Sequence, residues 1–372
     1  MDVLVVAGEA SGDQHAADAV TALKSLRPDV KCFGMGGAKM AAAGVELIHG
    51  AHEISVMGIV EVLPKIPRIW QVMNELEAAA VARKPKVALL VDVPDFNLRL
   101  AGRLKKLGIP VVYFVAPMAW AWREGRTRTI AKLVDTLCCI LPFEEKFFRE
   151  RGVNATYVGN PTLDQVPDDA GMTQFRASLG LPLEVPTVAV LPGSRRSEIT
   201  RLGPTLAATC QLLLKQHPGT NIVIPVASGL PREFVEAPFK AANVPVTLID
   251  GRAPEVVGAS EVAIVASGTA SLEAGLMRRP LVCVYRLNVI NYAIGRMLVR
   301  IPFFGLVNLL AGKRVVPELL QADMNPEKIM SELEPLWHGA AREVCLRGLD
   351  ELRTILGPRG AARRVAEIVS KY

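Results

Sequence analysis

The chain has 372 residues, half of them hydrophobic and 22% charged, and Lys and Arg outnumber Asp and Glu by 43 to 37. This composition excludes a disordered protein, and the length suits two domains with separate cores. The net charge of +6 favours an anionic partner. Because the aromatic residues are not grouped for base stacking and no basic helix or zinc-finger spacing occurs, we expect no nucleic-acid partner.

The cysteines and the N-terminus indicate the compartment. The six cysteines lack CxxC spacing and most lie in apolar patterns, which predicts core thiols in a reducing compartment. Met1 and Asp2 lead directly into a strand pattern without a signal peptide, so we expect a cytoplasmic protein. Arg296 and Arg300 interrupt the most apolar region, so we expect any membrane contact to be peripheral.

The first element is a buried strand that leads into a glycine turn. Residues 3–7 form a continuous apolar run, and GEASGD at 8–13 turns it into an amphipathic helix that reaches about Leu26. The turn lacks the GxGxxG spacing, and the next strand ends in GMGG at 34–37, where an NAD enzyme usually has an acidic residue. These features disfavour a dehydrogenase.

An apolar segment at 56–73 carries Lys65 and Arg68, and its two prolines interrupt any long helix. Two interpretations stay open. The segment is either a helix-turn-helix packed on the core or an apolar flap that contacts acyl chains or a membrane surface. Residues 288–304 have a similar composition and are a second candidate for membrane contact.

The first candidate for chemistry follows a predicted buried strand at 87–91. DVPDFN at 92–97 stands at the carboxyl end of this strand, where open α/β sheets bind ligands. Asp95 precedes a helix pattern and is interpreted as its N-cap. Asp92 has no such local role and is therefore the candidate, with a carboxylate that only hydrogen-bonds the following turn as the alternative.

A tryptophan-rich loop at 116–126 follows the next predicted strand. Trp120 and Trp122 carry more apolar area than a loop normally exposes, so we expect them to plug or line an interdomain cleft.

A proline-rich polar stretch at 161–186 marks a linker, and both halves of the chain show doubly wound α/β patterns. We predict domains at 1–165 and 166–340. The C-terminal helices at 341–372 are expected to pack on the first domain or on a partner subunit.

The second half contains two turns that suit phosphate. Arg195 lies on a glycine turn after the strand at 187–191, and its guanidinium suits a diphosphate, with a solvated basic loop as the alternative. After the strand at 262–266, Ser267-Gly268-Thr269 leads into a helix with Thr269 as the expected N-cap, whose first N–H groups favour an anion. Glu273 lies one turn further and is expected to accept ribose hydroxyls. An ordinary strand-to-helix turn is the alternative.

The chain resembles the lipid-A-disaccharide synthase family in eight segments that occur in the family's order, nearly end to end. These segments are GEASGD from Gly8, VMGIVEVL from Val56, DVPDFN from Asp92, PMAWAWRE from Pro117, LPFEE from Leu141, LPGSR from Leu191, SGTASLE from Ser267 and NLLAGK from Asn308.

The resemblance implies an α/β protein of GT-B fold, with two doubly wound Rossmann-like domains facing a cleft. It implies transfer of 2,3-diacylglucosamine from UDP to the 6-hydroxyl of 2,3-diacylglucosamine 1-phosphate, without metal or cofactor, giving a β-1',6-linked disaccharide phosphate and UDP. The expected location is the cytoplasmic face of the inner membrane, as a peripheral protein. A homodimer stays open.

The resemblance also implies residue roles. Asp92 matches the general base, Arg195 is expected to stabilise the leaving UDP, and Asn308 matches a position important for activity. Asn160 departs from the family, which often has His there, and this puts a proton role at that position in doubt. The expected UDP-binding residues are Arg195, Ser267, Gly268, Thr269, Ala270, Ser271 and Glu273, and the expected acceptor side comprises Gly8, Glu9, Ser11, Gly12, Asp13, Met57, Trp120 and Trp122.

Two alternatives remain at this point. A UDP-sugar epimerase of GT-B-like fold would share the phosphate turns but would not need apolar surface for acyl chains. A non-catalytic UDP-sugar or lipid binder would keep Arg195 and Glu273 but would not need Asp92.

Overall fold

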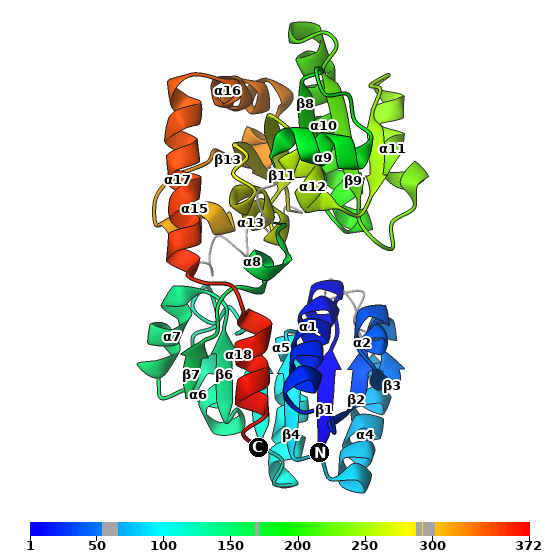
Figure 1. Cartoon of the computed structure of the whole chain (residues 1–372), viewed down its shortest axis with the longest axis vertical. Coiled ribbons are helices and arrows are strands. Elements are labelled where there is room, and N and C mark those ends of the chain that lie inside the picture. The colour runs from blue at the N-terminus through cyan, green and yellow to red at the C-terminus, as the bar shows by residue number, and fades with distance from the viewer. Residues whose placement is uncertain (54–65, 168–170, 288–291, 293–301) are drawn as a thin grey trace. The chain divides into compact units, whose positions relative to one another are not determined.

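The computed structural model describes residues 1–53, 66–167, 171–287, 292 and 302–372 (Figure 1). Met57, Lys65, Arg296 and Arg300 lie outside this set, and so does most of the second segment considered for membrane contact. The chain divides into two compact units, of which unit 1 comprises Met1–Pro161 and Pro358–Tyr372 and unit 2 comprises Thr162–Gly357.

Unit 1 is built on a parallel sheet with the strand order β3-β2-β1-β4-β5-β6-β7. Alternate residues of its central strands face different cores: Val3 and Val5 of β1 pack on one side, Leu4 and Val6 on the other. This explains why the strands are continuous apolar runs. The strands are β1 (Asp2–Ala7), β2 (Lys31–Gly36), β3 (Val45–Gly50), β4 (Val87–Val91), β5 (Val111–Phe114), β6 (Thr136–Cys139) and β7 (Ala155–Tyr157).

The last helix of the chain completes the core of unit 1. Within this unit α18 lies beside α1 (Figure 1), and Val365, Ala366 and Val369 are buried with residues of β1. Arg364 donates from Nε to the Val158 carbonyl at 2.7 Å. The helices of unit 1 are α1 (Ala10–Leu26), α2 (Ala38–Ala42), the short 3-10 helix η1 (Ala51–Glu53), α4 (Ile66–Arg83), α5 (Pro94–Lys106), α6 (Arg126–Leu133), α7 (Pro142–Arg149) and α18 (Ala361–Val369).

Unit 2 has a second parallel sheet, with the order β10-β9-β8-β11-β12-β13. Its strands are β8 (Thr187–Leu191), β9 (Asn221–Val226), β10 (Thr247–Asp250), β11 (Val262–Ala266), β12 (Leu281–Tyr285) and β13 (Glu318–Leu320). Its helices are α8 (Pro161–Gln165, which starts at the unit boundary), α9 (Met172–Leu179), α10 (Arg196–Gln216), α11 (Arg232–Ala241), α12 (Ala253–Gly258), α13 (Thr269–Leu276), α15 (Leu306–Ala311), η3 (Gln321–Asp323), α16 (Pro326–Trp337) and α17 (Ala340–Leu356).

Both sheets reverse their strand order once, at β1 and β4 in unit 1 and at β8 and β11 in unit 2. This confirms the prediction of two doubly wound α/β units. Ligands in such sheets bind outside the carboxyl ends of the strands at the reversal, which is called the switch point.

Two predicted helix starts are wrong. Helix α5 begins at Pro94, with Val93 as N-cap, so Asp95 lies inside the first turn. Proline is favoured there because its missing N–H and fixed φ suit the first helical position. Helix α13 begins at Thr269, with Gly268 as N-cap at φ 151°. Glycine adopts this positive φ at little cost, so the turn closes one residue earlier than predicted.

The prediction of core thiols is confirmed, because all six cysteines are buried and none forms a disulfide. No helix in the described ranges combines the length and the apolar character needed to cross a bilayer.

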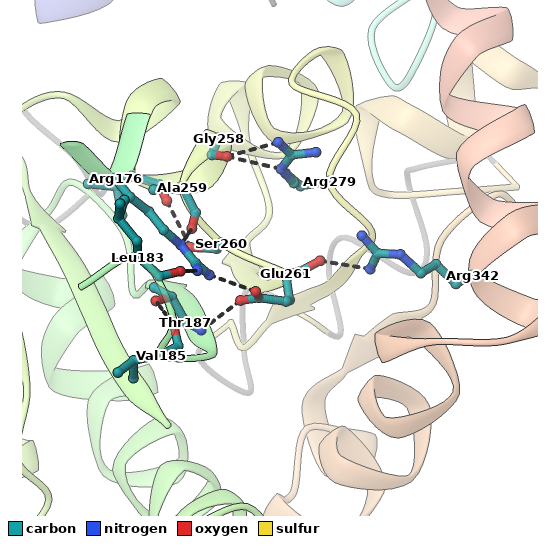
Figure 2. Close-up of polar contacts among 11 residues, drawn as sticks. Arg176, Leu183, Val185, Thr187, Gly258, Ala259, Ser260, Glu261, Arg279 and Arg342 are labelled. Carbon is teal, nitrogen blue, oxygen red and sulfur yellow. Dashed lines mark hydrogen bonds and ion pairs between the residues drawn. The ribbon is translucent and has the colours of Figure 1, made fainter. Parts of the chain in front are cut away.

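A half-buried carboxylate joins the amino ends of the central strands of unit 2 (Figure 2). Glu261 precedes β11 and accepts from the Thr187 N–H at 2.6 Å and from Arg176 Nη2 at 2.6 Å. Arg176 also donates to the Ala259 carbonyl, and Arg342 of α17 donates to the Glu261 carbonyl at 2.8 Å. Glu261 therefore ties β8, β11, α9 and α17 together.

We predict that Glu261→Ala destabilises unit 2 by about 3–5 kcal/mol, because it leaves the Arg176 guanidinium, whose side chain is 6% exposed, without its carboxylate. The matched control is Asp250→Ala, which breaks an ion pair with Arg232 whose side chains are 69% and 46% exposed. That loss should stay below about 1 kcal/mol. Urea unfolding of both variants measures the difference, and equal losses would contradict the role of Glu261.

Candidate functional site

The glycine turn after β1 and the carboxylate after β4 lie together at the switch point of unit 1. Ala7 pairs with Val91 in the sheet, so both strands end at the same level. A methyl group added at Gly12 would lie 3.8 Å from the Cβ of Asp92. The structure thus brings together two of the segments that sequence analysis singled out separately.

Asp92 occupies a strained turn. Its φ is 54° and that of Val93 is 43°, so two consecutive non-glycine residues are left-handed. A β-branched residue rarely adopts this conformation, and such strain is concentrated at functional sites. The Asp92 N–H donates to the Phe114 carbonyl at 3.0 Å, which ties the turn to β5.

The other carboxylate of DVPDFN is engaged at the surface. The side chain of Asp95 is 74% exposed and forms ion pairs with Arg126 and, at 3.6 Å, with Arg123. Asp92, by contrast, is half-buried. Asp92 therefore remains the candidate, and its reactive role stays a prediction.

Asp13 has a structural task within the glycine turn region. Its buried carboxylate accepts from the N–H groups of Gly37 at 2.7 Å, Lys39 at 3.1 Å and Met40 at 3.1 Å. These groups form the start of α2, so Asp13 caps that helix and fixes the second glycine turn against α1. Of the other predicted acceptor residues in this region, Gly8 and Gly12 are buried, Glu9 is the half-buried N-cap of α1, and Ser11 is exposed.

The two tryptophans differ in environment. Trp120 is half-buried and donates from Nε1 to Glu144 at 2.9 Å, whereas Trp122 is 41% exposed. Glu144 also accepts from the Ile140 N–H at 3.1 Å, and burial raises its pKa to about 7 although its N–H donors act in the opposite direction. Asn160 donates to the Ile140 carbonyl at 3.1 Å. Trp120 and Asn160 thus both secure the turn after β6.

In unit 2 the turn after β8 is folded around a carboxylate that sequence analysis missed. Glu198 accepts from the N–H groups of Ser194 at 2.9 Å and Arg195 at 3.2 Å, and its other oxygen lies 3.2 Å from Arg195 Nη1. Gly193 has φ 117°, and a Cβ there would lie 2.3 Å from Glu198. A Glu three residues after an N-cap was the available signal, but the N-cap is Arg195 rather than Ser or Thr.

The turn after β11 lies at the same sheet edge, because Val265 pairs with Leu191 of β8. Gly268 and Thr269 are exposed, and the N–H groups of Thr269 and Ala270, in the first helical turn, have no intrahelical carbonyl to bind. Ser267, Ala270 and Glu273 are half-buried, whereas Ser271 is buried and donates to the Gly268 carbonyl at 2.7 Å.

Asn308 is fully buried and all its bonds go to protein. Its Nδ2 donates to the Val316 carbonyl and to Glu318, both at 2.8 Å, and its Oδ1 accepts from the N–H groups of Val315 at 2.7 Å and Val316 at 3.0 Å. This amide is saturated. The predicted role of Asn308 in the reaction stays a prediction, and the geometry favours a positioning role over substrate contact.

Glu318, which sequence analysis also missed, links Asn308 to the turn after β11. It accepts from the N–H groups of Phe304 and Gly305, each at 3.1 Å, and burial raises its pKa. The Phe304 carbonyl in turn accepts from Ser267 Oγ at 3.3 Å. A continuous chain of hydrogen bonds therefore runs from Asn308 to Ser267.

Comparison with known proteins decides the family. The family model described as lipid-A-disaccharide synthetase matches residues 3–349. The chain belongs to this family. It is 57% identical to the lipid-A-disaccharide synthase of Myxococcus xanthus (strain DK1622) over 368 residues, covering 99% of this chain and 96% of that protein. Against the lipid-A-disaccharide synthase of Syntrophus aciditrophicus (strain SB) the identity is 42%, covering 98% and 96%.

Solved structures confirm the GT-B fold. A UDP-GlcNAc 2-epimerase from Neisseria meningitidis aligns with a TM-score of 0.62 and 14% identity, over 100% of this chain and 99% of that one. Acinetobacter baumannii MurG aligns with a TM-score of 0.56 and 13% identity, over 100% and 99%. At these identities the likeness shows the fold alone. Family membership makes the chain a glycosyltransferase of lipid A biosynthesis, and neither the epimerase nor the non-catalytic binder is retained.

Proposed function

We propose that the chain transfers 2,3-diacylglucosamine from UDP to the 6-hydroxyl of 2,3-diacylglucosamine 1-phosphate. The products are the β-1',6-linked disaccharide 1-phosphate and UDP. The observation that carries the proposal is which residues lie at the two switch points. Asp92 follows β4 in unit 1, and in unit 2 Arg195 follows β8 while the N-terminus of α13 follows the adjacent strand β11.

In the proposed reaction Asp92 is the general base for the acceptor. Its carboxylate takes the proton of the 6-hydroxyl while that oxygen attacks the anomeric carbon of the donor. The bond from this carbon to the UDP oxygen breaks, and its electron pair leaves with UDP. Attack opposite the leaving group inverts an α-linked donor to a β-linked product. Unit 1 thus serves as the acceptor side.

Unit 2 is the proposed UDP side. Departure of UDP places negative charge on the diphosphate, and Arg195 together with the first turn of α13 would stabilise that charge. Glu273, one turn into the helix, would accept the ribose hydroxyls. Asn308 and Glu318 support this site by fixing Phe304 and hence Ser267.

The general-base role predicts a turnover defect without a binding defect. Asp92→Asn should lower kcat by roughly 10² to 10⁴ fold, because the amide cannot take the proton, while folding and UDP binding stay nearly intact. Asp95→Asn is the matched control in the same segment, DVPDFN, and it should keep turnover within a few-fold. Steady-state assays with both lipid substrates measure this, and near-normal turnover of Asp92→Asn would transfer the role to another group.

The turn around Glu198 predicts a selective effect on UDP. Gly193→Ala should weaken UDP binding at least about tenfold, because the new Cβ would collide with Glu198 and displace Arg195. Gly229→Ala is the matched control, since Gly229 also has a positive φ (88°) but nothing lies within 4 Å of the added Cβ. Calorimetric titration with UDP compares the two, and equal affinities would place UDP elsewhere.

We also propose peripheral binding to the cytoplasmic face of the inner membrane. Helix α4 contains residues 66–73 of the apolar segment at 56–73 and exposes Ile66 (38%) and Trp70 (44%). The Arg103 guanidinium lies 5.2 Å from the centre of the Trp70 ring, so apolar and cationic groups occur together, as at an interfacial surface.

Sedimentation with anionic liposomes tests this surface. The double variant Ile66→Ser and Trp70→Ser should bind severalfold less, and binding of the unaltered chain should fall at high salt because lipid charge is screened. Ile69 is kept because it packs against the core. Val344→Ser, at a 61% exposed position on α17, is the control. Unchanged binding of the double variant would show that α4 is not the contact.

A further inference from the structure

We infer that Tyr113 and Asn97 are positioning residues for Asp92: together they hold its backbone in the left-handed turn that aims its carboxylate. This inference extends the proposed function and rests on the role of Asp92 as the general base of the proposed reaction. Sequence analysis gave neither side chain a role: Tyr113 belongs to an apolar strand, and Asn97 is the last residue of DVPDFN.

The turn needs an external restraint. Left-handed backbone at a non-glycine residue costs roughly 1–3 kcal/mol, and here Asp92 and Val93 adopt it in succession. Without compensating bonds the segment would relax to an ordinary strand-to-helix connection. The Cα–Cβ bond of Asp92 would then point in a different direction.

The compensating bonds converge on one carbonyl. The oxygen of Asp92 accepts from Tyr113 OH at 2.6 Å and from Asn97 Nδ2 at 2.8 Å, and Asn97 Nδ2 also lies 3.1 Å from the Val91 carbonyl. The Asp92 N–H is bound to the Phe114 carbonyl at 3.0 Å. Both backbone groups of Asp92 are therefore fixed, from the neighbouring strand β5 and from α5.

Both donors are rigid because they are fully buried. Burial and the nearby Asp92 charge raise the pKa of Tyr113 well above its ordinary value, so its hydroxyl stays protonated and able to donate. Among the described residues Asn97 Oδ1 has no hydrogen-bond partner, which costs about 1–3 kcal/mol. The hydrogen bonds of the Asn97 side chain are thus donated by Nδ2 to the carbonyls of Val91 and Asp92.

The role of Tyr113 predicts a kinetic signature. Displacement of a catalytic group by about 1 Å can cost on the order of 10²-fold in rate. Tyr113→Phe keeps the ring and removes the hydroxyl, so kcat should fall about tenfold or more while the KM of both substrates stays within about twofold. Tyr157→Phe, which removes a hydroxyl from β7 of the same sheet, is the control and should leave kcat near normal. An unchanged kcat in Tyr113→Phe would overturn the inference.

A double-mutant cycle separates this inference from the proposed function. If Tyr113 acts through the Asp92 carboxylate, Tyr113→Phe should cause little further loss in an Asp92→Asn background. An equal fold-loss in both backgrounds would overturn the positioning role while leaving Asp92 as the base. Near-normal turnover of Asp92→Asn alone would instead overturn the proposed function. Asn97→Ser, if it folds, should reproduce the non-additivity.

Discussion

The two central strands of the second unit are held together by their backbone ladder and by the carboxylate of Glu261. It binds the first N–H of β8 from the residue that precedes β11, so it fixes these two central strands at their amino ends. Each of these strands is five residues long, and the turns that follow them carry Arg195 and Ser267. A shift by one residue moves a strand end by about 3.3 Å and exchanges the faces of its side chains. The Glu261 carboxylate thus supports the alignment of the two anion-suited turns from the opposite edge of the sheet.

A shared feature of both units is that buried and half-buried polar side chains hold the turns and helix starts next to the sheets. Asp13 holds the start of α2, Asn308 and Glu318 hold the start of α15, and Glu144 holds the turn after β6. Each must be bonded inside the protein because an unpaired buried polar group is costly. Saturation makes these turns rigid, and rigid turns are what preorganised catalysis needs.

Much of the fold follows from local pattern, and much of the site does not. The strands at Val87–Val91, Thr187–Leu191 and Val262–Ala266 match their predicted bounds, because strands buried on both faces appear as continuous apolar runs. The bonding partners of Asp13 and the Tyr113 hydroxyl bond to Asp92 are not predictable locally, since the partners are more than 20 residues away in the chain. Nor does a pattern distinguish a ligand-binding carboxylate from one that, like Glu198, is bound to its own turn.

The turns after β8 and β11 in unit 2 offer different kinds of hydrogen-bond donor. This difference affects how the negative charge on the departing diphosphate would be stabilised in the proposed reaction. The N–H groups of Ser194 and Arg195 are taken by Glu198, so the turn after β8 contributes chiefly a guanidinium side chain. The first turn of α13 contributes backbone N–H groups and the helix dipole. The guanidinium supplies charge-assisted side-chain donors, and the fixed N–H groups supply backbone donors of set direction. Because Glu198 already orients Arg195, the charge that develops on a departing diphosphate would meet donors that need little reorganisation, which is the condition for electrostatic stabilisation of a transition state.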